Sequence, residues 1–182
     1  MTKANRNAFL RAFGILAVSS WAAVSARADD AACKPVWDAT FKYVTTPNHT
    51  FSTSTGLMGD GKIQKSEMIS TGKSRFVMVD GSWMVNRMTD QEMLDIEKEK
   101  ASSSKAQCRW VRDEATAGET AALYAVHSET DGKKSDEQVW ISRHSGLPLK
   151  IELDLHVGAV GGASHMSSRM VYDNIRAPDG VK

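Results

Sequence analysis

The residues best suited to chemistry in this 182-residue chain are five histidines and two cysteines. The histidines stand far apart, and none has a partner at a metal-ligand spacing such as His-Glu-x-x-His. A histidine without such a partner is more often solvated or hydrogen-bonded than a ligand. The sequence therefore predicts no metal site among His49, His127, His144, His156 and His165.

The nearest match to a nucleophile motif is Gly-Ala-Ser-His-Met at 162–166. It lacks the final glycine of the nucleophile elbow and does not join a strand to a helix. The chain also has no glycine-rich phosphate loop and no dinucleotide fingerprint. We therefore expect no catalytic residue, no cofactor and no enzymatic activity.

Residues 1–28 resemble a secretory signal peptide. A basic start is followed by an apolar run at 12–24 and by Ala26-Arg27-Ala28, the small-x-small pattern of a cleavage site. The alternative is a membrane anchor, but a spanning helix needs about 20 apolar residues, and two serines interrupt this shorter run. We expect cleavage after Ala28 and, because short alanine-rich signals are typical of bacteria, a periplasmic protein with no transmembrane segment in its mature form.

Residues 29–182 then form a single domain. Removing 28 residues takes away four of the 23 basic residues and none of the 22 acidic ones, so the formal net charge falls from +1 to about −3. Without a basic block, binding to nucleic acid or electrostatic docking on anionic lipid is not expected. A content of 41% hydrophobic and 25% charged residues is typical of a folded domain.

Cys33 and Cys108 are the two cysteines. An exported protein meets an oxidising compartment, where such a pair is normally bridged. The alternative is a redox or metal pair, but there is no Cys-x-x-Cys motif and no nearby histidine. The sequence favours a structural disulfide.

Two helices and about nine strands must position these residues. One amphipathic helix is expected from Pro35 until Pro47 stops it, and a second after the capping-box pattern that starts at Thr89. Strands are expected at 49–58, 63–71, 73–79, 82–88, 107–114, 120–128, 137–143, 149–157 and 164–172, linked by Gly59-Asp60-Gly61, Asp80-Gly81, Ala117-Gly118, Asp131-Gly132-Lys133 and the glycines at 158–162.

These patterns predict a mainly antiparallel β fold with few helices, of the α+β class. One apolar face of such a sheet must be covered by helices, a second sheet or a ligand. We expect a curved sheet or incomplete barrel, with the N-terminal and mid-chain helices over its apolar concave face. Eight methionines after the signal, at 58, 68, 78, 84, 88, 93, 166 and 170, would suit a surface for acyl chains or simply fill gaps in a core.

Four segments resemble the outer-membrane lipoprotein carrier (LolA-like) superfamily. They are the helix after the signal, the hairpin at 75–83, the stretch 139–150 that ends in Gly-Leu-Pro-Leu-Lys, and Tyr-Asp-Asn-Ile at 172–175. The resemblance covers the whole mature chain and includes no catalytic motif. It implies an incomplete antiparallel barrel that binds lipid or acyl chains in an apolar cavity.

The sequence thus favours a periplasmic, non-catalytic binding or carrier protein for an amphiphile, namely a lipid, an acyl chain or a lipoprotein. The alternative is an envelope-sensing module with the same fold that binds a periplasmic or outer-membrane protein. The expected ligand-binding residues are Phe76, Met78, Trp83, Val85, Leu153 and Leu155. Alternation alone leaves open which face is concave, because a shift of one residue exchanges the faces.

Overall fold

The computed structural model describes residues 30–56, 62–130, 133–156 and 163–181. The predicted signal peptide and the turns predicted at 59–61 and 158–162 lie outside the described residues, as does most of the link predicted at 131–133. The elements are α1 (Asp30–Thr45), β1 (Asn48–Thr55), β2 (Gln64–Ser70), β3 (Arg75–Val79), β4 (Ser82–Asn86), α2 (Asp90–Ser103), β5 (Gln107–Thr116), β6 (Glu119–Thr130), β7 (Lys133–Ser142), β8 (Pro148–His156) and β9 (Ala163–Val171).

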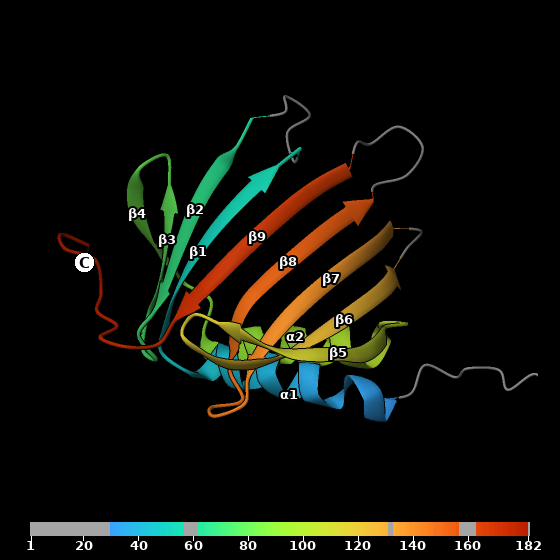
Figure 1. The fold of residues 1–182 in the computed structure, drawn as a ribbon. Coiled ribbons are helices and arrows are strands. Elements are labelled where there is room, and N and C mark those ends of the chain that lie inside the picture. The colour runs from blue at the N-terminus through green and yellow to red at the C-terminus, as the bar shows by residue number, and fades with distance from the viewer. Residues whose placement is uncertain (1–29, 57–61, 131–132, 157–162, 182) are drawn as a thin grey trace, which may run out of the picture.

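The described strands form one antiparallel sheet of nine strands, in the order β4-β3-β2-β1-β9-β8-β7-β6-β5. The sheet is curved and stays open, because β4 and β5 form its two edges and do not pair with each other. Both helices cross the same end of the sheet, and the strands extend beyond them (Figure 1). The predicted fold class is confirmed.

Local sequence explains most element ends. Asp80-Gly81 and Ala117-Gly118 have positive φ at both positions, which is the two-residue turn that suits the twist of a hairpin. Thr89 caps α2 through the predicted capping box, with reciprocal bonds between Thr89 and Glu92. One boundary was wrong: α1 begins at Asp30 rather than at Pro35, so the proline lies inside the helix.

The two sides of the sheet differ in what they contact. The helix side, which carries Thr50, Met68, Val126 and Ile151, faces α1, as the bond between the Tyr43 and Thr50 hydroxyls shows. Under α1 it contributes to a buried cluster made of Cys33, Val36, Ala39, Ala106, Val126, Val139 and Ile141. The outer side carries a second buried cluster of Ala121, Leu123, Trp140 and Leu149.

The helix side is less apolar than expected. Where β1, β2 and β9 extend beyond the helices, serines alternate with outer-side residues, and the Ser52 and Ser168 hydroxyls are 2.8 Å apart. Serines of β1 and β9 thus share the helix side with Leu153, Leu155 and Met166 of β8 and β9, so this face is mixed rather than uniformly apolar. Strand alternation predicts which residues share a face but not how far the helices cover it.

The predicted disulfide is present. It joins Cys33 on α1 to Cys108 on β5, with 4.9 Å between the Cα atoms and 75 residues of separation. Because α1 precedes every strand and β5 is an edge of the sheet, the bond ties the start of the helix to that edge.

Removing the disulfide should lower the free energy of unfolding by about 4 kcal/mol, because closing a loop of this length restricts the unfolded chain. The measurement is urea unfolding of the protein and of a Cys33→Ser, Cys108→Ser variant, each with and without reductant. Reductant should destabilise only the unsubstituted protein. Equal stability of the oxidised protein and the variant would contradict the prediction.

Candidate functional site

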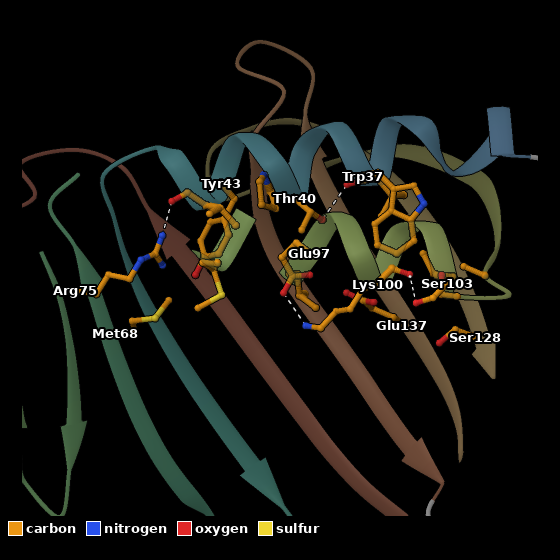
Figure 2. Close-up of a pocket in the computed structure, with 18 residues that line it drawn as sticks. Trp37, Thr40, Tyr43, Met68, Arg75, Glu97, Lys100, Ser103, Ser128 and Glu137 are labelled. Carbon is orange, nitrogen blue, oxygen red and sulfur yellow. Dashed lines mark hydrogen bonds and ion pairs between the residues drawn. The ribbon is translucent and has the colours of Figure 1, made fainter. Parts of the chain in front are cut away.

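A half-open cavity of about 420 Å³ lies between α1, α2 and the helix side of the sheet (Figure 2). This volume is within the range of small-molecule sites, which are roughly 300–1,000 Å³. Its wall is formed by Val36, Trp37, Thr40, Tyr43, Val44, Met68, Arg75, Met93, Glu97, Lys100, Ser103, Ser104, Ala106, Val126, Ser128, Glu137, Pro148 and Ile151.

The wall is predominantly apolar and comes from both layers of the fold. α1 contributes Trp37 and Val44, and the sheet contributes Met68 and Ile151. Met93 lines the cavity from α2. Figure 2 shows the cavity running from Arg75 and Met68 at one end to Ser103 and Ser128 at the other. Such a space can receive an apolar chain, with polar groups available along its length.

The cavity exists because α2 covers the sheet without packing into it. No residue of α2 is buried, and the helix packs mainly against α1. Its sequence is dominated by charged residues, so it has no apolar stripe wide enough to fill the space below. α2 therefore forms a cover over the cavity, and Met93 and the stems of Glu97 and Lys100 form the inner surface of that cover.

Arg75 fixes one end of this cover. Its side chain is 2% exposed and donates to the Val44 carbonyl and, at 2.8 and 3.0 Å, to Oδ1 of Asp90. Val44 lies near the end of α1 and Asp90 is the first residue of α2. One guanidinium group thus joins β3 to both helices, and Asp90 also suits the positive end of the α2 dipole.

Replacing Arg75 by methionine should lower the free energy of unfolding by about 3 kcal/mol, because it removes the buried cation that satisfies Val44 and Asp90. The measurement is denaturant unfolding. The matched control is Arg112→Met, since Arg112 is exposed and pairs with Glu114 on the same strand; it should change stability little. Equal effects of the two substitutions would show that Arg75 does not hold the helices in place.

Three charged side chains face one another across the middle of the cavity. Glu97 and Lys100 lie on α2, 2.6 Å apart between Oε1 and Nζ, and Glu137 projects from the helix side of β7 (Figure 2). The pKa of the Glu137 carboxyl is raised from 4.5 to about 7. Burial is the main cause and the negative charge of Glu97 adds to it, whereas the positive charge of Lys100 acts in the opposite direction. The Glu137 side chain makes no hydrogen bond within the described part of the chain.

The shift makes stability depend on pH. Because the folded protein keeps a proton on Glu137 that the unfolded chain releases, stability should fall as the pH rises from about 4.5 to about 7. Glu137→Gln should therefore be more stable than the unsubstituted protein at pH 8, by up to about 3 kcal/mol, and similar to it at pH 4. Urea unfolding at both pH values measures this.

The control is Glu129→Gln on neighbouring β6, where the glutamate is exposed on the outer side. It should show no such pH-dependent gain. The prediction fails if Glu137→Gln is no more stable than the unsubstituted protein at pH 8.

Other buried polar groups of the wall are partly satisfied. The Tyr43 hydroxyl is 2.9 Å from Oγ1 of Thr50, and burial raises its pKa above 10.0. Thr40 donates to the Val36 carbonyl of its own helix. The buried Ser104 hydroxyl has no hydrogen-bond partner among the described residues.

The structure separates the six residues that the sequence singled out for ligand binding. Leu153 and Leu155 lie on the helix side, where Leu153 is the cross-strand neighbour of Glu137. Phe76, Met78, Trp83 and Val85 lie on the outer side, opposite the face that carries Met68 and Val77. None of the six lines the cavity, and their contact with a ligand stays a prediction.

The sequence analysis did not name the cavity-lining residues as ligand-binding residues. It pointed to some of them only through the methionines as a group. Met68 and Met93 belong to the methionines that suggested an adaptable surface. No sequence signal marked Arg75 or Glu137, because the burial of a charged side chain depends on elements distant in the sequence.

Four of the five histidines make cross-strand pairs with carboxylates on the outer side. His49 lies 2.9 Å from Glu67, His165 lies 2.8 Å from Asp154, and His127 and His156 lie 2.8 and 3.5 Å from Asp136. Among the described residues, no group of three or more histidines, cysteines, aspartates or glutamates is placed to hold a metal ion.

Ser164 and His165 are consecutive residues of β9 and therefore point to opposite sides of the sheet.

No helix of the described chain is long and apolar enough to cross a membrane.

Comparison with protein-family models finds no match, and neither does comparison with curated proteins. Among solved structures, MucB in complex with MucA(peri) matches at 16% identity and a TM-score of 0.41, over 82% of this chain and 59% of that one. LprF from Mycobacterium bovis matches at 8% identity and a TM-score of 0.39, over 80% and 93%. A LolA superfamily protein from Nitrosomonas europaea matches at 8% identity and a TM-score of 0.30, over 81% and 96%.

This chain spans 59% of the length of the MucB chain. All three TM-scores are below 0.5, so the fold and the cavity described above stand on the geometry of this chain.

Proposed function

We propose that this protein is a periplasmic, non-catalytic binding or carrier protein for an amphiphile such as a lipid, an acyl chain or a lipoprotein. The observation that carries the proposal is the half-open cavity of about 420 Å³ between α1, α2 and the sheet. Protein interiors are packed as densely as organic crystals, so an apolar space of this size under a cover is the property of a site rather than of a core.

The features of the chain outside the cavity agree with this proposal. The N-terminal 28 residues resemble an export signal, and the disulfide between Cys33 and Cys108 suits an oxidising compartment.

A second candidate is a protein-interaction module. The observation that favours it is the β3–β4 hairpin, whose strand β4 is an edge of the sheet. Its residues Val79, Met84 and Val85 are 47%, 55% and 42% exposed. An uncovered edge strand with apolar side chains can pair with a strand of another protein. This surface is separate from the cavity, so the two candidates can be tested independently.

Native mass spectrometry of the protein purified from the periplasm of the cells that make it tests the first candidate. We expect additional mass that organic extraction removes and that matches a lipid or an acylated peptide. A bare protein that also fails to bind an apolar fluorescent dye would contradict the proposal and favour the interaction module, whose partner cross-linking would then identify.

A larger side chain on the inner surface of α2 should fill part of the cavity and weaken ligand binding. Met93→Trp places a larger side chain in the cavity and should weaken binding of an apolar dye at least about tenfold. The matched control is Ile96→Trp, because Ile96 lies on the same helix, is 38% exposed and does not line the cavity. Fluorescence titration measures both variants, and equal affinities would show that the dye binds elsewhere.

A further inference from the structure

The cavity contains one carboxylate that the protein does not pair. Glu137 lies on the helix side of β7, and its cross-strand neighbours Val126 and Leu153 are uncharged. From α1, the cavity receives Trp37, Thr40 and Tyr43, which carry no charge at neutral pH. The charged groups that face Glu137 come from α2 and are Glu97 and Lys100.

The positive charges of the wall are already matched. The Lys100 ammonium is 2.6 Å from Glu97, and the Arg75 guanidinium is held by Asp90 and the Val44 carbonyl. Of the charged side chains that line the cavity in the described structure, Glu137 is therefore the one without an opposite charge bonded to it. The Ser104 hydroxyl, also in the wall, is a second buried polar group without a partner among the described residues.

We propose that this cavity selects amphiphiles whose polar end is a protonated amine, held by Glu137, over amphiphiles that end in a carboxylate. This inference rests on the proposed function and specifies its ligand. An ammonium group is a hydrogen-bond donor that carries a positive charge, and an ionised Glu137 carboxylate, which only accepts, is its complement in both respects. A carboxylate at the same place would face the charges of Glu137 and Glu97 with no unpaired cation to balance them.

The inference has a signature in pH. The raised pKa of Glu137, about 7, means that its ionised form grows between pH 6 and pH 8, so preference for the amine should grow over the same range. A protonated Glu137 that donated to an anionic head group would give the opposite trend. The two chain-end groups themselves keep their charges over this range, because ordinary amines titrate near 10 and carboxyls near 4.

The experiment compares dodecylamine, dodecanoate and dodecanol, which share one apolar chain, as competitors of a bound apolar dye. It uses the full protein, Glu137→Gln and the matched control Glu129→Gln at pH 6 and pH 8. We expect dodecylamine to bind about tenfold tighter than dodecanoate at pH 8 and less so at pH 6. Glu137→Gln should abolish the preference, and Glu129→Gln should retain it.

The outcomes separate the two proposals. Equal affinity for the three compounds, preference for dodecanoate, or an amine preference that survives in Glu137→Gln would overturn the head-group inference and leave the binding function standing. Failure of all three to displace the dye, or absence of dye binding, would overturn both. Thermal unfolding of each variant checks that the protein remains folded.

Discussion

The buried guanidinium of Arg75 is the contact on which the cavity depends. It joins β3 to the end of α1 and the start of α2, through the Val44 carbonyl and the Asp90 carboxylate. The disulfide between Cys33 and Cys108 ties the other end of α1 to the edge of the sheet. Both ends of α1 are thus fixed, and α2 is held at its N-terminus by an ion pair. Because this attachment does not require α2 to bury an apolar face, the helix can cover the sheet while a space remains beneath it.

The composition of the wall decides what this space is suited to. Its apolar residues favour an apolar chain, because water in such a space loses hydrogen bonds. Its two positive charges, on Lys100 and Arg75, are each paired with a carboxylate, whereas the Glu137 carboxylate has no cation bonded to it. An unpaired, largely buried carboxylate lowers the stability of the folded protein at neutral pH. A ligand with a positive charge would offset this loss of stability. Glu137 therefore links the stability of the protein to its ligand selectivity.

Much of the fold could be predicted because it depends on local patterns. The turn at Asp80-Gly81 and the cap at Thr89 follow from residue types at fixed positions. The cavity could not be predicted in this way. Alternation grouped Trp83 with Val85 and Leu153 with Leu155 correctly, but nothing local indicates that the first pair faces away from the helices and the second towards them. From sequence alone, Arg75 and Glu137 would be expected to be exposed charged residues. They are covered in the structure because α1 and α2 lie over this part of the sheet. The length of sheet that the helices cover is likewise set by tertiary packing.

The most direct test of the central claim, that an apolar chain enters the space under α2, is methyl NMR of the protein labelled at its methionines. Met68 and Met93 line the cavity from the sheet and from α2, whereas Met84 is 55% exposed on the edge strand. Titration with dodecylamine should move the Met68 and Met93 methyl resonances along one saturable curve and leave Met84 in place. Unchanged Met68 and Met93 resonances at ligand concentrations that saturate binding would contradict the account.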